Sequence, residues 1–406
     1  MPESEQKTDR YRWVILGVLW ITYIVVFLNR LSVGPLAPFF KYDLNITSTQ
    51  VGLVMSAASF GYMLTMFPVG WLVDRIGAKW PIVLGEMIAG LCMIALFFAT
   101  SYMYLLTFMF ITGMGCGFLL PATTQSVIAW FPLRERATVM GLKQTAVNIG
   151  GITTAATLPA ISLALGWRYG FLFLGLTAIV VGIVALLIYR EPRESFSGTV
   201  GSAMVDAAVP LLEILKNREI WLLALCGFCM TWVEMAIIAH LVLYLTEILV
   251  FGVVAAGGLL ALTEVAGAVA RPGAGFISDW VFSGNRKHVF MWIAGMALGM
   301  SLVIGLWGAY LSWLIYPVLV IMGIGGIAFG GIWLTLLSEF GGRRGAGKAV
   351  GLGGVIMIAG GVMGPPIFGY MVDATGSYQW AWLSLALVSG VCMLLLLFVR
   401  EKQRKI

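Results

Sequence analysis

Charged residues are scarce in this sequence. Only 11% of its 406 residues are Asp, Glu, Lys or Arg, whereas soluble domains contain about 25%. A chain with so few charges cannot cover a water-facing surface, and 60% of its residues are hydrophobic. A soluble enzyme, a disordered chain and a secreted disulfide scaffold therefore all fit poorly. The composition indicates an all-α membrane protein with many spans.

Histidine and cysteine are scarce too, with two and five residues. All five cysteines fall in hydrophobic runs, where cysteine usually packs as a small apolar side chain. Cys226 and Cys229 have redox-motif spacing but lack its alternating strand–helix context. The sequence also lacks a metal-ligand cluster, a phosphate-binding loop and a nucleophile motif. We therefore expect no cofactor, no metal, no enzyme activity and no ATP-driven cycle.

Long hydrophobic runs dominate instead. A spanning helix needs about 20 apolar residues, and the chain accommodates twelve with short loops. The runs are too continuous for a membrane β-barrel. Residues 1–10 are polar and precede a long run without a small-residue cleavage site, so we expect no cleaved signal peptide. The expected spans are 13–38, 49–73, 80–99, 103–130, 138–165, 167–189, 219–250, 254–279, 288–308, 311–339, 349–374 and 378–399.

Basic residues are distributed asymmetrically. Of the 25 Lys and Arg residues, 20 fall at the two ends of the chain and in alternate loops, whereas only Lys41 and Arg168 fall in the opposite loops. Because short cytoplasmic loops are rich in Lys and Arg, we expect a protein of the inner membrane with both termini in the cytoplasm. The net charge of +6 reflects this asymmetry and does not indicate nucleic-acid binding.

The sequence repeats internally. The polar stretch 190–218 separates six spans from six, which predicts a half at 1–189, a central cytoplasmic loop at 190–218 and a half at 219–406. Residues 140–151 align with 350–361 at an offset of 210. Two six-helix halves related by a parallel repeat are typical of one large transporter class.

One loop carries a family resemblance. Gly70-Trp-Leu-Val-Asp-Arg-Ile-Gly-Ala-Lys79, between the second and third spans, resembles the signature of the major facilitator superfamily. A second copy begins at Gly275, with Trp280 in place of the usual basic residue after Asp279. The resemblance covers the whole chain and implies the major facilitator fold. It also implies that Asp74, Arg75 and Asp279 gate the transporter, by capping a helix start or pairing with a loop arginine.

Shorter motifs resemble two branches of that superfamily. Residues 27–35, Gly61-Tyr62 and 130–136 are similar to the anion:cation symporter branch, although Asn29 and Cys116 stand where that branch has acidic residues. Ala270-Arg271-Pro272-Gly273 is similar to the monocarboxylate transporter family, with Gly267 in place of its aspartate.

Three basic residues remain at membrane depth: Arg30, Lys143 and Arg271. Each costs about 2.5–3.5 kcal/mol at a helix centre, which makes them substrate-binding candidates unless they extend to an interface. The superfamily resemblance places all three on cavity-lining helices, where an arginine fork suits a carboxylate. The other polar and aromatic candidates, for which core packing is the alternative, are Tyr23, Asn29, Tyr62, Gln125, Gln144, Asn148, Trp232 and Trp333.

Glu264, Glu234 and His240 are the candidate proton carriers. Glu264 and Arg271 share one helix face but are separated by about 10 Å of helical rise, too far for a direct pair. A substrate or another helix could lie between them. Glu86, on the third span, is expected to be structural. Three Gly-x-x-x-Gly pairs, at Gly113/Gly117, Gly326/Gly330 and Gly360/Gly364, predict close helix packing.

These features predict a monomeric secondary transporter in the lipid bilayer. Its expected partners are a small organic anion, most simply a carboxylate, and a co-transported proton, moved by alternating access. Two alternatives stay open: an exchanger of two anions, which needs no proton carrier, and a membrane sensor that does not transport.

Overall fold

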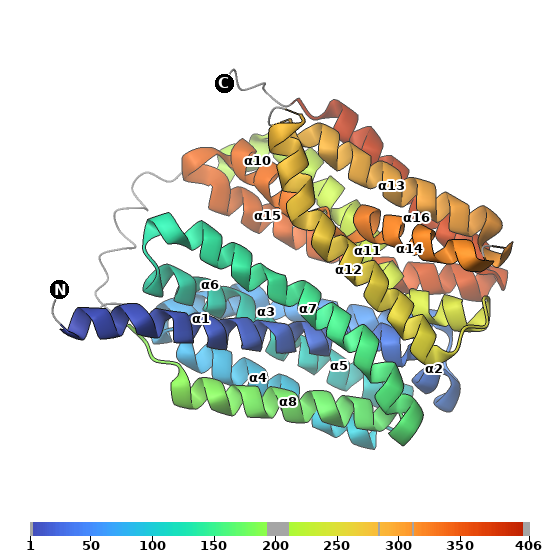
Figure 1. Ribbon diagram of the computed structural model, residues 1–406, viewed down its shortest axis with the longest axis horizontal. Helices are drawn as coiled ribbons and strands as arrows, with labels where there is room; N and C mark the ends of the chain where they lie inside the picture. Colours follow the sequence, from blue (N-terminus) through green and yellow to red (C-terminus); the bar gives the residue numbers. More distant parts are fainter. Residues whose placement is uncertain (1–2, 193–210, 283–284, 311, 401–406) are drawn as a thin grey trace. The chain divides into compact units, whose positions relative to one another are not determined.

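A computed structural model describes the chain except for residues 1–2, 193–210, 283–284, 311 and 401–406 (Figure 1). Most of the expected central loop and the basic C-terminal tail therefore lie outside the described residues. Within the described residues every regular element is a helix. Eleven helices are long and apolar enough to cross a membrane, or twelve if the bent pair Ser48–Met66 and Pro68–Ile76 is one span. The predicted all-α, many-span fold is confirmed.

The chain divides into two compact units. The first comprises residues 1–44 and 57–198. In this unit α1 packs on α7 and α8, and α4 packs between α5 and α8. Its helices are α1 (Glu3–Arg30), α2 (Val33–Asp43), most of α3 (Ser48–Ile76), α4 (Lys79–Ala95), α5 (Tyr102–Gly117), α6 (Leu119–Trp130), α7 (Leu133–Leu165) and α8 (Trp167–Ile188).

The second unit comprises residues 45–56 and 199–406. Here α11 packs on α15, α12 on α14 and α13 on α16. Its further helices are α10 (Leu211–Lys216), α11 (Arg218–Glu247), α12 (Val253–Trp280), α13 (Arg286–Trp307), α14 (Ile315–Ile327), α15 (Gly330–Thr375) and α16 (Tyr378–Phe398). At Gly342, with φ +65°, α15 bends sharply, so its first part completes the span begun by α14.

The start of α3 belongs to the second unit because it forms hydrogen bonds with α15. Asp373 accepts the backbone N–H groups of Ser48 and Thr49 at 3.0 and 2.7 Å, and the Thr49 hydroxyl. These N–H groups have no acceptor within the helix, and a carboxylate also suits the positive end of the helix dipole. Residues 45–56, which the sequence placed in the half 1–189, therefore belong to the second compact unit.

Two of the three glycine pairs act as predicted. A Cβ at Gly113 would lie 2.0 Å from the Ala58 carbonyl oxygen, and one at Gly360 would lie 2.0 Å from the Phe228 carbonyl oxygen. The prediction for the third pair is wrong at Gly330, where a Cβ would meet nothing within 4 Å, whereas a Cβ at Gly326 would lie 3.0 Å from Ile237 Cδ1. The reason is that the helix is interrupted between α14 and α15, so these two glycines do not share one continuous face.

Among the described residues, three further spans contain a short break in the helix. The first breaks between Arg30 and Val33, the fourth at Phe118 and the tenth between Ile327 and Gly330. The residues that precede α6 and α15, Phe118 and Phe329, stand at nearly the offset of the internal repeat. A break leaves carbonyl groups without helical donors, and such carbonyls attract cations.

Candidate functional site

Arg30 lies at the first of these breaks, as the last residue of α1. Its guanidinium carbon lies 4.3 Å from the ring centre of Tyr62 and 5.5 Å from that of Phe27. The aromatic faces and the carbonyl end of α1 both favour a cation there. Among the described residues Arg30 forms no ion pair, so its charge is available to an anion.

Lys143 of α7 is only 2% exposed. Its Nζ donates to the hydroxyls of Thr123 and Thr124 at 3.1 and 3.2 Å and lies 4.6 Å from the Tyr23 ring centre. This burial argues against a lysine that extends to the membrane interface.

Tyr23 connects the two cations. Its ring packs on Phe27 with centroids 5.3 Å apart, and it lies close enough to interact with Tyr62 and Arg30. Arg30, Lys143, Tyr23 and Tyr62 therefore form one group, which we call the N-terminal cation cluster. It unites three of the predicted substrate-binding residues.

In the second unit Arg271 pairs with a carboxylate from another helix. Its Nη2 lies 3.5 Å from Oε1 of Glu234 on α11. Its Nε and Nη2 donate to the Ile327 carbonyl at 3.2 and 3.1 Å. Ile327 ends α14, so the break in the tenth span supplies this acceptor.

Glu264 lies in the same region, near both Glu234 and Arg271. It is 3% exposed, and its Oε1 has no hydrogen-bond partner. We call Arg271, Glu234 and Glu264 the C-terminal ion cluster. The predicted lack of a direct Glu264–Arg271 pair agrees with this arrangement, in which α11 and α14 supply the partners of Arg271.

Within the described ranges, several buried polar groups lack hydrogen-bond partners. Both amide atoms of Asn29, Oδ1 of Asn148 and Nε1 of Trp232 are in this state. Gln144, one turn from Asn148 on α7, is exposed. Because buried polar atoms are normally satisfied, Asn29, Asn148 and Trp232 can accommodate a polar ligand or water.

Other candidates have packing partners. The Trp333 indole donates to the Leu223 carbonyl at 2.7 Å and occupies the space above Gly227. Nε2 of His240 lies 2.9 Å from the Pro365 carbonyl oxygen, and its ring stacks on Phe368. Both contacts join α11 to α15.

Glu86 was expected to be structural, yet neither of its buried oxygens has a hydrogen-bond partner. Its side chain is 1% exposed on α4. The described residues therefore provide no contact that accounts for a carboxylate at this position.

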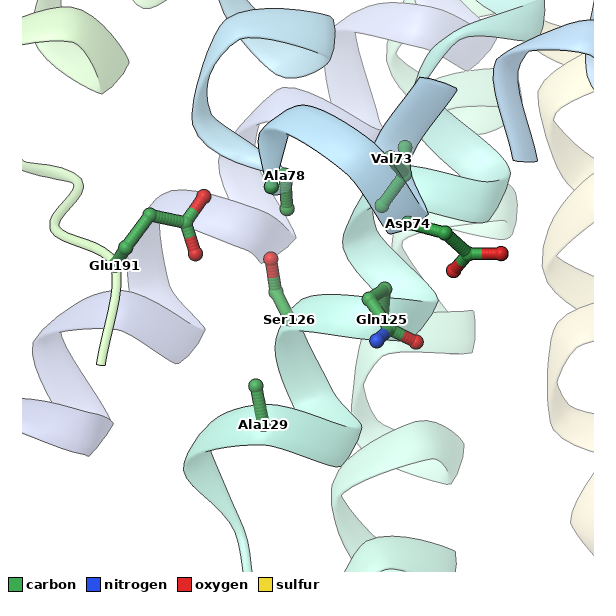
Figure 2. A pocket seen from close by; sticks show the side chains of 8 residues that line it. Val73, Asp74, Ala78, Gln125, Ser126, Ala129 and Glu191 are labelled. Atoms are coloured by element: carbon green, nitrogen blue, oxygen red, sulfur yellow. The ribbon is translucent and has the colours of Figure 1, made fainter. Parts of the chain in front are cut away.

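Gln125 lies apart from the N-terminal cation cluster, in a small pocket beneath the signature loop. The pocket has a volume of about 50 Å³ and is also lined by Asp74 and Glu191. Figure 2 shows Gln125 between Asp74 on one side and Ser126 and Glu191 on the other. This placement associates Gln125 with the gating residues.

Glu191, which sequence reasoning missed, caps the helix after the signature loop. It accepts the backbone N–H of Lys79, the first residue of α4, at 2.8 Å. Gly77 has φ +79°, and a Cβ there would lie 2.5 Å from Glu191 Oε1, which explains the signature glycine. Asp74, the expected cap, is exposed. No local sequence pattern links Glu191 to a helix start 112 residues earlier.

The same loop region holds a buried phenol. The hydroxyl of Tyr189 lies 2.6 Å from Ser126 Oγ, and burial raises the pKa of Tyr189 above its ordinary value. The phenol therefore stays protonated and fixes the start of the chain segment that carries Glu191.

The remaining gating candidates have clear partners. The Arg75 guanidinium carbon lies 3.6 Å from the Trp71 ring centre. Asp279 Oδ1 lies 3.3 Å from Arg286 Nη2, and Arg286 also pairs with Glu339 at 3.0 Å. Asp279 thus pairs with the arginine that begins α13.

The sequence profile of the Major Facilitator Superfamily matches residues 19–357. The chain belongs to the major facilitator superfamily. It is therefore a multi-pass membrane protein of a transporter family and not an enzyme. A solved bacterial homologue of the human lysosomal transporter Spinster shares the fold, with a TM-score of 0.81, 17% identity and coverage of 96% of this chain and 97% of that one.

Similar proteins match nearly the whole chain. A protein of Cupriavidus necator named a probable sulfoacetate transporter is 26% identical, covering 96% of this chain and 94% of its own. The hexuronate transporter of Bacillus subtilis is 24% identical, with 91% and 90% covered. The membrane sensor protein UhpC of Escherichia coli is 26% identical, with 98% and 94% covered.

Proposed function

We propose that this protein is a secondary transporter of a small organic anion that carries a carboxylate, coupled to protons and working by alternating access. It acts in the inner membrane with both termini in the cytoplasm. The observation that carries the proposal is the N-terminal cation cluster, because its two basic side chains, the half-buried Arg30 and the buried Lys143, lack a carboxylate partner among the described residues. A bound anion would supply the missing negative charge.

The relatives support an anionic substrate. Two of them are named as transporters of sulfoacetate and of hexuronate, both small organic anions. In this chain Arg30 and Lys143 are the proposed substrate-binding cations of the first unit, and Arg271 is the proposed substrate-binding cation of the second unit. Polar contacts from Tyr62, Gln144 and Asn148, and packing by Trp232, would then select the substrate. Gln125 and Trp333 are less favoured as substrate-binding residues, because Gln125 lines the loop pocket and Trp333 packs α15 on α11.

Proton coupling is assigned to the C-terminal ion cluster. Glu264 is the first candidate because it is buried near Arg271 without a hydrogen bond to one of its oxygens. Glu234 is the second, since it already pairs with Arg271. His240 ranks third. Its contacts with Pro365 and Phe368 indicate that it packs α11 against α15, which favours a structural role.

Replacing Arg30 by alanine should weaken substrate binding about 10-fold, since a hydrogen bond to a charged group contributes about 1.5 kcal/mol or more. Binding measured by scintillation proximity or calorimetry tests this. The matched control is Arg75→Ala, which removes another guanidinium stacked on an aromatic ring, but at the signature loop. Wild-type affinity in correctly folded Arg30→Ala protein would remove Arg30 from the site.

Replacing Asp74 by asparagine should slow turnover about fivefold or more while leaving substrate affinity unchanged, because the side chain lies in the loop pocket and not in either charged cluster. The measurement is the balance of the two open states, followed by labelling of single cysteines placed on each side of the membrane. The gating role fails if this balance equals that of the wild type.

Uptake of labelled anions into proteoliposomes separates the candidate functions. Accumulation driven by a pH gradient supports symport, whereas uptake that needs internal anion supports the exchanger. A folded protein that binds an anion but moves none would support a sensor, the function named for the relative UhpC. Absence of any anion binding would overturn the proposal altogether.

A further inference from the structure

An apolar groove runs along the outer surface of the second unit, between α13 and α16. It has a volume of about 640 Å³, and all of its lining residues are apolar. The two helices lie side by side (Figure 1). The groove exists because α16 presents the small residues Ala386 and Gly390 one turn apart, between the protruding side chains of Leu387 and Leu394.

The length of the groove matches one leaflet of a bilayer. Its lining on α13 runs from Met291 to Leu302, which corresponds to about 17 Å of helix. Half of a hydrocarbon core is about 15 Å thick. Both α13 and α16 qualify as membrane spans, and Leu387 is 70% exposed in the structure. Hydrocarbon chains of lipids therefore face this groove.

Cations lie at one end of the groove. Lys287 precedes Met291 by one turn on the same face of α13, and its Nζ donates to the carbonyls of Leu397 and Val399 at 3.1 and 2.7 Å. Arg400 is the second residue after the end of α16 and is exposed. One carboxylate lies nearby, since Glu219 accepts the Arg400 backbone N–H at 3.0 Å. Within the part of the chain that the structure describes, this end of the groove thus holds the basic residues Lys287 and Arg400 beside the acidic Glu219.

We propose that this groove binds one anionic phospholipid. An acyl chain lies between α13 and α16, and the phosphate lies beside Lys287 and Arg400 at the membrane surface. Basic residues at the end of a helix pair attract anionic headgroups, while van der Waals packing against the apolar lining holds the chain. The groove lies on other helices than the C-terminal ion cluster, which α11 and α12 carry, and it is independent of the transported substrate.

The test measures lipid binding to the purified full-length chain by native mass spectrometry, with dioleoyl phosphatidylglycerol and dioleoyl phosphatidylcholine as probes. The wild type should retain phosphatidylglycerol preferentially. Gly390→Leu fills the groove and should reduce retention of both lipids at least 10-fold. Its new Cβ would meet only the flexible end of Leu298, at 3.3 Å. Leu394→Trp is the second filling variant, should Gly390→Leu fail to fold.

Charge and bulk are tested separately. Arg400→Gln should reduce phosphatidylglycerol binding about fivefold, equivalent to about 1 kcal/mol, and leave phosphatidylcholine binding unchanged. Val180→Leu, on the outer surface of α8 where Val180 is 58% exposed, is the bulk control and should bind lipid as the wild type does. Equal binding of the two lipids by the wild type, or unchanged binding in the filling variants, overturns the proposal. A filling variant that dissociates a dimer but keeps its lipid shows instead that the groove is an interface between copies.

Discussion

Arg271→Lys protein is expected to transport its substrate about 10- to 100-fold more slowly than the wild type, although its charge is conserved. The guanidinium uses Nε and Nη2 to bind the Ile327 carbonyl and Nη2 to reach Glu234. The planar fork can keep this anchor and still present N–H groups to an anion. A lysine ammonium has no such fixed geometry, and each hydrogen bond to a charged group contributes about 1.5–3 kcal/mol.

The chain offers a closely matched control for this substitution. Arg168 also donates Nε and Nη2 to one backbone carbonyl, that of Ala99, at 3.0 and 2.8 Å, and pairs with Asp43 at 2.9 Å. It lies outside both charged clusters. Arg168→Lys should therefore retain uptake, measured as initial rates in proteoliposomes with equal amounts of folded protein. Equal rates for Arg271→Lys and the wild type would show that Arg271 does not contact substrate.

The fold follows from the sequence because membrane insertion depends on local composition. Runs of about 20 apolar residues specify spanning helices whatever their neighbours are, and the signature beginning at Gly70 identifies the superfamily. The span boundaries were less accurate where a helix is interrupted. The first span, for example, runs from Tyr11 to Asp43 through a break after Arg30, beyond the expected 13–38. A break of one to three residues leaves hydropathy almost unchanged.

The charged groups of the site were also predictable, because ionisable residues inside a membrane are rare and conspicuous. Their partners were not. The ion pair of Arg271 with Glu234 depends on how α12 packs on α11, and its bond to Ile327 depends on the break after α14. The position of Gln125 beneath the signature loop likewise depends on which face of α6 is turned toward α3. Such packing depends on contacts between residues distant in sequence, which a single sequence does not reveal.

Proton coupling requires that a carboxylate of the C-terminal ion cluster bind a proton when the substrate anion binds. In the empty protein Glu234 balances the charge of Arg271, whose guanidinium lies 3.5 Å away, and an ionised Glu264 would add one further negative charge. A substrate anion bound to Arg271 offsets that positive charge, so a second negative charge nearby becomes costly in a low-dielectric site. Binding a proton to Glu264 removes this cost. Substrate and proton therefore favour each other's binding, as linkage requires.

Glu264→Gln should consequently abolish accumulation driven by a pH gradient while exchange of internal for external substrate continues. For one proton per monovalent anion, a gradient of about one pH unit supplies about 1.4 kcal/mol, enough for tenfold accumulation. In the variant the internal concentration should only equal the external one. Glu86→Gln is the matched control, since it removes another buried carboxylate without hydrogen-bond partners, on α4 of the first unit. It should keep the gradient response. Tenfold accumulation in Glu264→Gln vesicles would exclude Glu264 as the coupling residue and direct the same experiment to Glu234.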